Sequence, residues 1–335
     1  MGQQENQLKI LVTGGGGFIG SALVKRLLDK GHQISSLSRK KYPHLEALNV
    51  KTIQADLVDR KAIFQAVNGH EIVIHTAALA GYWGSAKEYY RSNVLGTVNI
   101  IDACKKFKIQ KLLYTSSASV VFSGENIING SPDLSYPDKA LNHYSHTKAI
   151  AEQLILAANF SLMKTISLRP HIVLGPGDNH ILPRLIQRAK SGKLKVIGDG
   201  QNQIDFVYID NLVDAHMDAL KAMDQNPSSL GKAYFITNEE PVNLWNFVNQ
   251  ILTGIGLPVV SGRMSSRMAL AVANFLCVFN KLFKPNQEPI LTPFLVKELS
   301  QSHWFDPLPA KRELGYTPSL NSEQTLDLLI EYLKV

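Results

Sequence analysis

The segment YSHTK at positions 144–148 places two side chains with complementary chemistry four residues apart. On a helix, Tyr144 and Lys148 would share one face, so the lysine ammonium could lie close to the tyrosine phenol. A phenol has a reference pKa of about 10, and a neighbouring cation lowers that pKa by stabilising the phenolate. Tyr144 could then exchange a proton near neutral pH, and Ser117, which ends the run TSS, could hydrogen-bond the substrate oxygen. A tyrosine and a lysine at this spacing are common on ordinary helices, so their significance depends on the surrounding motifs.

A glycine-rich turn provides such a motif. The segment TGGGGFIG at 13–20 follows the apolar run KILV and precedes a helical pattern. Gly14, Gly17 and Gly20 permit a tight turn, a close approach of the backbone to a pyrophosphate, and close packing of the helix on the strand. A purely structural glycine turn is the alternative. The position between a strand and a helix favours a dinucleotide site.

The residues after the second apolar run indicate which dinucleotide would bind. An NAD site usually has an acidic residue about 20 positions beyond the glycines, where it bonds the ribose 2′-hydroxyl. Here Ser38 occupies that place and is followed by Arg39, Lys40 and Lys41. Guanidinium and ammonium groups stabilise a 2′-phosphate, which a carboxylate would repel. We therefore expect NADP (NADPH) in preference to NAD, with a merely solvated basic loop as the alternative.

Three further residues fall at the ends of predicted strands. Asp56 closes the third strand, where its carboxylate could accept a hydrogen bond from the adenine amino group. Ala77 and Ala78 end the fourth strand with side chains small enough to admit the cofactor. A helix cap for the aspartate and tight packing for the alanines are the structural alternatives. The order of these residues along the sheet supports the cofactor interpretation.

The elements that must position these residues alternate short β-branched runs with longer helical patterns, which is typical of βαβ units and a parallel sheet. We predict a doubly wound α/β fold, the NAD(P)-binding Rossmann fold, over residues 1–174. The pattern then becomes loop-rich, so residues 175–335 are expected to form mainly a smaller α/β substrate-binding region, with some segments returning to the sheet. The predicted strands are 9–14, 33–38, 50–56, 71–78, 111–117, 164–170 and 231–238, and the clearest helices are 18–29, 61–67, 89–107, 144–159, 182–191 and 208–220.

The composition narrows the function classes. The 335 residues are 45% apolar and 19% charged, which suits a packed core, and the formal net charge of +7 fits an anionic ligand, an acidic membrane or nucleic acid. Nucleic acid is not expected, because the basic residues are dispersed and no recognised module accompanies them. Cys104 and Cys277 form no disulfide or metal pattern, so no metal site is expected. The first residues lack a secretion or myristoylation pattern, so we expect a cytoplasmic protein.

Taken together, the motifs resemble those of the extended short-chain dehydrogenase/reductases. The resemblance implies Tyr144 as catalytic acid or base, Lys148 as a ribose ligand that tunes the tyrosine, and Ser117 as the residue that orients the carbonyl or alcohol. It also implies a homodimer paired through the helices that carry NVLGT and YSHTK. The matching motifs are TGGGGFIG, HTAA, NVLGT, YTSSASV, YSHTK, LRPHIVLGPGD and DFVYIDN, and the implied cofactor contacts include Phe18, Ile19, Asp56, Leu57, Asn93, Pro170 and His171, the last two beside the nicotinamide.

Within this superfamily, the chain resembles the 3β-hydroxysteroid dehydrogenase branch, including the sterol-4α-carboxylate 3-dehydrogenases. The segments TSSASVVFSG, GKAYFITNEEPV and LGYTP carry that resemblance. AGYWG and GPGDNHILPRL equally resemble the bacterial 2-alkyl-3-oxoalkanoate reductases. Both imply hydride exchange between a secondary alcohol and a ketone on a bulky apolar substrate, either a sterol or a branched 3-oxoacyl acid.

Two other functions stay open at this point. Nucleotide-sugar epimerases and dehydratases of the superfamily commonly have an arginine that pairs with the substrate diphosphate where this chain has Ile204. Losing that partner favours an apolar ligand, although Arg184 or Arg188 could replace it. The other alternative is a non-catalytic NADP(H)-sensing protein, which would not need the tyrosine, lysine and serine together.

The most hydrophobic segment is 268–283, MALAVANFLCVFNKLF, which has basic residues at both ends. It is shorter than the roughly 18 apolar residues of a spanning helix, and two asparagines interrupt it. We expect first a buried or substrate-covering helix. Peripheral contact with an anionic membrane is the second expectation, and a transmembrane span is the last.

Overall fold

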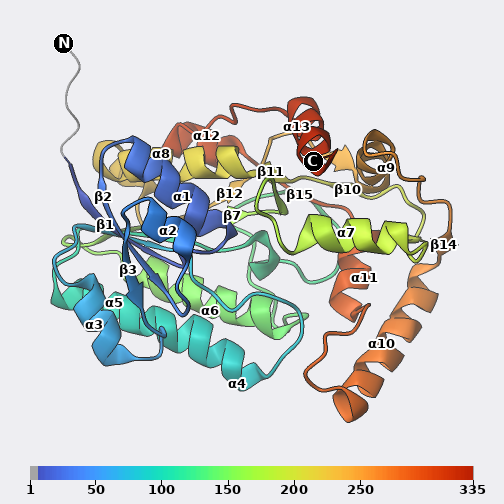
Figure 1. Cartoon of the computed structure of the whole chain (residues 1–335), viewed down its shortest axis with the longest axis horizontal. Coiled ribbons are helices and arrows are strands. Elements are labelled where there is room, and N and C mark those ends of the chain that lie inside the picture. The colour runs from blue at the N-terminus through green and yellow to red at the C-terminus, as the bar shows by residue number, and fades with distance from the viewer. Residues whose placement is uncertain (1–6, 335) are drawn as a thin grey trace.

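A seven-stranded parallel sheet forms the centre of the computed structural model, which describes residues 7–334 (Figure 1). Its order is β12-β7-β5-β4-β1-β2-β3, and the order reverses between β1 and β4, where a doubly wound fold binds its ligand. The predicted Rossmann-type fold is therefore confirmed. The strands are β1 (Lys9–Thr13), β2 (Gln33–Ser38), β3 (Lys51–Gln54), β4 (Ile72–His75), β5 (Lys111–Thr115), β7 (Lys164–Pro170) and β12 (Lys232–Ile236). Residues 1–6, on which the expectation about N-terminal signals depends, lie outside the described residues.

Helices cover both faces of this sheet because its strands are apolar on both sides. Ile10 and Val12 of β1 belong to one buried cluster and Leu11 to the other, as alternation along a strand requires. The first cluster is covered by α1 (Phe18–Asp29), α8 (Ile209–Gln225) and α12 (Leu308–Leu314). The second is covered by α3 (Arg60–Val67), α5 (Gly96–Lys106) and α6 (His143–Ala157).

One predicted helix is interrupted. The segment 89–107 divides into α4 (Ala86–Tyr89), the π-helical turn η1 (Tyr90–Leu95) and α5. A π-helical turn has one extra residue per turn, so it changes which side chains face the sheet, and such turns are frequent at functional sites. The short helix α2 (Pro43–Ala47) was not predicted.

The rest of the chain forms a smaller α/β region beside the carboxyl ends of the main strands (Figure 1). A mixed sheet with the order β13-β10-β15-β6 crosses it. β6 comes from the first half of the chain, while β12 comes from the second half and joins the main sheet. The two sheets therefore do not separate at residue 174. The division at that residue into a cofactor-binding part and a substrate-binding part stays a proposal. The remaining elements are β6 (Ile127–Gly130), β8 (Val173–Leu174), β9 (Val196–Ile197), β10 (Gln203–Ile204), β11 (Val207–Tyr208), β13 (Val242–Asn243), β14 (Arg263–Met264), β15 (His303–Phe305), η2 (Ala118–Val120), η3 (Pro227–Ser229), α7 (Ile181–Lys190), α9 (Leu244–Gly254), α10 (Ser266–Phe283), α11 (Pro293–Ser300) and α13 (Ser322–Lys334).

Helix α10 contains the hydrophobic segment, and the expectation that it is buried is wrong. Of its residues, Ala269, Ala273 and Asn280 are buried, and most of the others are exposed. Among the described residues it is the one helix long and apolar enough to cross a membrane by length and composition, with 17% of that window buried. Hydrophobicity alone could not show that its outer face has no protein partner.

Candidate active site

Tyr144 and Lys148 lie one turn apart near the start of α6. Asn142 begins this helix, and its side-chain oxygen accepts a hydrogen bond from the Ser145 backbone N–H at 2.7 Å. The Lys148 Nζ donates to the Thr115 carbonyl at 2.5 Å and lies 4.0 Å from the centroid of the Tyr114 ring. The helix cap and these two contacts from β5 therefore hold the lysine against the carboxyl end of the central sheet.

Ser117 lies beside Tyr144 just beyond the end of β5. Burial raises the pKa of the Tyr144 phenol, and its hydrogen bond with Ser117 acts in the opposite direction. Burial lowers the pKa of Lys148 to about 7, although the Glu152 carboxylate one turn later on α6 favours the charged form. Tyr144 is therefore protonated at neutral pH and can donate a proton, and Lys148, one turn later on α6, has a pKa near neutrality.

The sheet brings Pro170 and His171 to the same place. Thr115 of β5 pairs with Leu168 of β7, so Pro170, two residues further along, ends its strand at the level of Ser117. His171 follows immediately and is buried. The segment predicted beside the redox end of the cofactor therefore lies next to the predicted catalytic residues.

The glycine turn fits a dinucleotide pyrophosphate. A Cβ on Gly20 would lie 2.1 Å from the Gly14 carbonyl oxygen, so only glycine lets α1 pack this closely on the turn. Gly14 has a φ of +73°, and a Cβ there would lie 2.9 Å from the Ala77 Cα. Gly17 begins α1, and no side chain caps the first N–H groups of the helix, which are the donors that bind phosphate in such turns. Phe18 and Ile19 form the first turn of this helix.

The basic cluster lies beside the glycine turn. A small cavity there is lined by Ser38, Lys40, Lys41 and Tyr42, with residues of β2 and β3. The Ser38 Oγ accepts a hydrogen bond from the Gly16 N–H at 3.4 Å, which joins the end of β2 to the turn. The Arg39 side chain is exposed next to this cavity, and its carbonyl accepts from the Gln54 side chain. The basic side chains and the Ser38 hydroxyl are thus gathered beside the glycine turn.

Asp56 and Leu57 follow β3 in different environments. Asp56 is exposed and accepts a hydrogen bond from the Val58 N–H, whereas Asp59 caps α3, so the helix-cap alternative for Asp56 is wrong. Leu57 is buried against Gly96 of α5. Asp56 is therefore available to an adenine, and Leu57 has a packing role that does not require a ligand.

Ala77, Ala78 and Asn93 lie together at the end of β4. Ala77 donates from its backbone N–H to Thr13, and Ala78 is partly exposed. The Asn93 side chain, in the π-helical turn η1, accepts from the Leu79 N–H at 2.7 Å and donates to the Thr147 hydroxyl at 3.1 Å. Asn93 thereby connects the end of β4 to α6, one residue before Lys148.

His75, a buried residue that was not predicted from the sequence, connects β1 to α5 in this region. His75 ends β4 between Thr13 and Thr97, with ring contacts of 2.7 and 3.0 Å. The Thr97 hydroxyl donates its proton to the Asn93 carbonyl, so His75 Nε2 must donate to Thr97 and Nδ1 must accept from Thr13. Burial and Lys148 lower the pKa of His75 to about 3, so the ring is neutral. The motif HTAA contained this residue, but nothing local indicated its partners.

Two further buried histidines, His171 and His303, contact each other beyond the end of β7. His171 Nδ1 forms an ion pair with Asp205, and His171 Nε2 lies 3.0 Å from His303 Nδ1. His303 Nε2 must donate to the Glu298 carbonyl, which can only accept, so one proton is shared between the two facing nitrogens. Burial alone would lower the pKa of His171, but Asp205 outweighs burial and raises it. Next to His171, Ile172 has a φ of +30°, a strained value for a β-branched residue that these contacts hold in place.

The arginines that could replace a missing diphosphate partner are already engaged. Arg184 binds Glu288 through two hydrogen bonds of 3.1 and 2.9 Å, and Arg188 donates to the Ile290 carbonyl. Ile204 is buried in β10. Both arginines therefore have protein partners, and a nucleotide-sugar diphosphate that paired with either would have to displace them.

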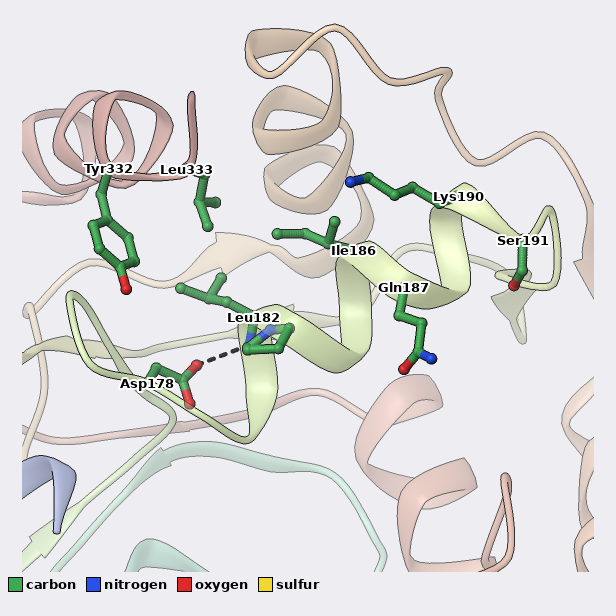
Figure 2. A pocket seen from close by; sticks show the side chains of 9 residues that line it. Asp178, Leu182, Ile186, Gln187, Lys190, Ser191, Tyr332 and Leu333 are labelled. Atoms are coloured by element: carbon green, nitrogen blue, oxygen red, sulfur yellow. Dashed lines mark hydrogen bonds between the residues drawn. The ribbon is translucent and has the colours of Figure 1, made fainter. Parts of the chain in front are cut away.

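A further cavity is not lined by these groups. It measures about 640 Å³ and is lined mainly by apolar side chains of α7 and α13. In Figure 2, Leu182 and Ile186 face Tyr332 and Leu333, while Asp178 accepts from the backbone at the start of α7. Ser117, Tyr144 and Lys148 do not line this cavity, so we do not place the chemistry there.

Comparisons with known proteins identify the family of the chain. The chain is 41% identical over 321 residues to 2-alkyl-3-oxoalkanoate reductase of Stenotrophomonas maltophilia, covering 95% of this chain and 97% of the relative. It is 33% identical to the mouse sterol-4-alpha-carboxylate 3-dehydrogenase, decarboxylating, covering 96% and 90%. A solved structure of UDP-glucuronic acid 4-epimerase from Bacillus cereus in complex with NAD superposes with a TM-score of 0.75 at 22% identity, covering 98% and 99%, and shows the fold alone. Residues 11–265 match a family model, and the chain belongs to the 3-beta hydroxysteroid dehydrogenase/isomerase family.

Proposed function

We propose that this NAD(P)-dependent oxidoreductase interconverts a secondary alcohol and a ketone on a 3-hydroxy or 3-oxo acid that has a bulky apolar body. The observation that carries the proposal is the grouping of Ser117, Tyr144 and Lys148 at the carboxyl end of β5, at the same edge of the sheet as the glycine turn. The names of the two relatives share one chemical feature, which is a carboxylate on the carbon beside the reacting one. A sterol and a branched acyl chain both remain candidates for the apolar body.

The residues divide the reaction between them. The bound nicotinamide supplies or accepts the hydride. Tyr144 donates a proton to the substrate oxygen during reduction and removes it during oxidation, while Ser117 holds that oxygen in place. Lys148 stabilises the phenolate form of the tyrosine and has ammonium donors beyond the one that Thr115 uses, which suit the ribose hydroxyls.

The side chains near the tyrosine suit an apolar substrate. Phe294 of α11 lies 4.7 Å from Tyr82 and 6.2 Å from Phe122, measured between ring centroids. Tyr82 is close enough to Tyr144 for the charge of one phenol to raise the pKa of the other. This aromatic group offers apolar contact area, and Arg184, the cation that acts on Tyr82, is bound to Glu288, so we favour an alcohol or ketone of a lipid over a nucleotide sugar.

The catalytic role is tested by Tyr144→Phe. This change removes one hydroxyl, so turnover should fall on the order of a thousandfold while cofactor affinity stays within about twofold. Turnover is measured with 2-alkyl-3-oxo acids, sterol acids and a nucleotide sugar, and affinity by quenching of protein fluorescence. A wild-type protein that binds cofactor but turns over none of these would favour the NADP(H)-sensing alternative, and retained turnover in the variant would refute the role of Tyr144.

We also propose NADPH as the preferred cofactor, because Ser38, Lys40 and Lys41 line the cavity beside the glycine turn. Replacing Arg39 and Lys40 together by alanine should raise the KM for NADPH by at least about tenfold and leave that for NADH nearly unchanged, since only NADPH has the 2′-phosphate. The exposed Lys105→Ala is the control. A wild-type kcat/KM that favours NADH would overturn this assignment.

Two further proposals concern partners. We propose a homodimer paired through η1, α5 and α6, where Tyr90 and Leu95 are 46% and 42% exposed. Light scattering should then report twice the mass of one chain.

We also propose peripheral contact between residues 268–283 and a membrane, because this segment is apolar, exposed and flanked by basic residues.

A further inference from the structure

A buried ion pair joins α6 to β7 outside the group of catalytic side chains. The Glu152 carboxylate is fully buried and pairs with Arg169, which is 2% exposed. Arg169 donates to it from Nε at 3.0 and 3.1 Å and from Nη2 at 2.8 Å. Two hydroxyls complete the set, since Ser167 donates at 2.7 Å and Tyr136 at 2.9 Å. Hydrogen bonds to a charged form favour that form, so these donors hold Glu152 as a carboxylate.

Stability alone does not account for this pair. Taking two charges out of water is unfavourable, and apolar residues of similar volume in place of a buried ion pair are often neutral or stabilising. Its position is therefore better explained by what its charges act on. Ser167 and Arg169 are two residues apart on β7, so both point to the face that α6 covers, while Leu168 belongs to the cluster on the other face. The strand thus directs its donors at one carboxylate of α6.

The place of Glu152 on α6 relates it to the catalytic residues. Tyr144, Lys148 and Glu152 follow one another at intervals of four, so they form one row along the helix. Lys148 and Glu152 are 1% and 0% exposed, and at this depth a charge acts more strongly on its neighbours than it does in water. From Tyr144 the row therefore alternates phenol, ammonium and carboxylate, and Arg169 adds a guanidinium beside the carboxylate.

The other ionisable groups that face Lys148 do not supply a negative charge. Its Nζ lies 4.0 Å from the ring centroid of Tyr114 on β5, and its charge acts on His75 of β4. Both groups are neutral at neutral pH, because burial raises the pKa of Tyr114 and lowers that of His75 to about 3. Arg169 of β7 has a like charge and is paired with Glu152. Burial lowers the pKa of Lys148 to about 7, and Glu152 acts in the opposite direction.

We propose that Glu152 is a positioning residue of the reaction, whose buried carboxylate, held by Arg169, keeps Lys148 an ammonium while Tyr144 exchanges its proton. The inference rests on the proposed function and adds to it a group that acts through Lys148. Ketone reduction leaves Tyr144 as a phenolate, which the ammonium stabilises. Reduction therefore starts from a site in which both the phenol and the ammonium are protonated. Its rate should fall as pH rises through the pKa of Lys148, so the basic limb of the pH profile reports the charge that Glu152 controls.

The test is the pH dependence of kcat/KM for reduction, by the full chain, of the 3-oxo acid that the wild type reduces best. Glu152→Gln removes the charge but leaves Arg169 unpaired in the interior, so Glu152→Gln with Arg169→Gln removes both charges. Glu152→Asp keeps the charge. Glu313→Gln is the matched control, because Glu313 also accepts from a lysine and a tyrosine, Lys232 at 2.8 Å and Tyr234 at 2.6 Å, near the start of β12 and away from the site.

The charge on Lys148 is also followed without turnover. NMR of protein labelled with carbon-13 at the lysine Cε reports the titration of each ammonium. The signal that is lost in Lys148→Arg is the signal of Lys148. This measurement separates a change in the charge of the lysine from a change in the chemistry.

We expect the basic limb to move to lower pH by at least about one unit in Glu152→Gln, so that the rate at roughly pH 8 falls at least about tenfold. On the acidic plateau the rate should stay within about twofold of the wild type, because Lys148 is charged there in both proteins. The double variant should shift less in the same direction, since it also loses the like charge of Arg169. Glu152→Asp should restore most of the shift, and Glu313→Gln should leave the limb in place.

Two results would overturn the proposal. One is a basic limb and an NMR midpoint that stay in place in both variants that lack the carboxylate. The other is a rate that falls by the same factor at every pH, which is the result of a merely structural role. If the wild type reduces no 3-oxo acid but the NMR midpoint of Lys148 still moves in Glu152→Gln, the proposed function fails and the control of Lys148 by Glu152 stands.

Discussion

Lys148 shows how one buried residue connects the fold to proton transfer. Its ammonium is enclosed by the sheet and has Thr115 as its hydrogen-bond acceptor, and burial lowers its pKa to about 7. The same burial raises the pKa of Tyr144. The hydrogen bond from Ser117 lowers the pKa of Tyr144, and we propose that the charge on Lys148 adds to this effect and favours the phenolate, which alcohol oxidation requires.

Lys148→Met should move the pH dependence of alcohol oxidation. Without the cation the pKa of Tyr144 rises further, so the acidic limb of kcat/KM should shift to higher pH and the rate at neutral pH should fall on the order of a hundredfold. The KM for the cofactor should also rise, because a proposed ribose ligand is lost. Lys148→Arg, which keeps the charge, should restore part of the rate at neutral pH. An acidic limb that stays in place in the methionine variant would contradict this role.

At the scale of elements, the glycine turn and α1 act as one unit. The Cβ of an alanine at position 20 would lie 2.1 Å from the Gly14 carbonyl oxygen, and backbone cannot move aside as a side chain can. Gly20→Ala should therefore shift the turn, cost about 1–3 kcal/mol of stability, and weaken cofactor binding more than tenfold. Fluorescence titration and urea unfolding measure the two effects.

Gly254→Ala is the matched control for that experiment. Gly254 also lies in a helix, α9, but an added Cβ would meet the movable end of the Ile330 side chain at 2.5 Å. We expect a change in stability with cofactor affinity unaffected. If the two substitutions weaken cofactor binding equally, the turn has no special dependence on Gly20.

The sequence predicted the elements whose signals are local. Strands such as 33–38 and 164–170 were predicted as short segments between helical patterns, and the structure has them at those residues. The π-helical turn at Asn93 was not predicted, because no local signal marks its extra residue and the Asn93 side chain contacts Thr147, which is 54 positions away in the chain. His171 and His303 are far apart in the chain, so their shared proton depends on the pairing of β10 with β15. The outer face of α10 was mispredicted because hydrophobicity does not specify the partner.

At the scale of the molecule, the two regions are joined by exchanged strands. β12 completes the main sheet from the second half of the chain, and β6 joins the smaller sheet from the first half. Asp205 receives a backbone hydrogen bond from Phe305 while it pairs with His171, so the redox end also depends on both halves. We therefore expect the chain to unfold as one cooperative unit, whose stability reflects buried groups in either region.

Two buried neutral histidines should make this unit sensitive to acid. Burial lowers the pKa of His75 to about 3 and that of His216 to about 4, whereas both rings titrate near 6.5 in the unfolded chain. At pH values between the folded and the unfolded pKa, each histidine binds a proton in the unfolded state but not in the folded state. The free energy of unfolding therefore falls as pH falls, by about 2 kcal/mol per histidine from roughly pH 6.5 to pH 5. His171 has the opposite sign, because its pKa is raised: its contribution is present below about pH 6.5 and is lost as pH rises through the folded value.

Urea unfolding at several pH values between neutral and mildly acidic measures this loss directly. His216 donates to the Leu212 carbonyl and accepts from the Thr115 hydroxyl, and a glutamine can offer one donor and one acceptor without titrating. His216→Gln should therefore lower stability at neutral pH but remove about half of the acid-dependent loss. His44→Gln, at an exposed position, should leave the slope as in the wild type. An unchanged slope in His216→Gln would mean that the acid sensitivity comes from carboxylates, and the paired Glu152 and Asp205 would then be the groups to substitute next.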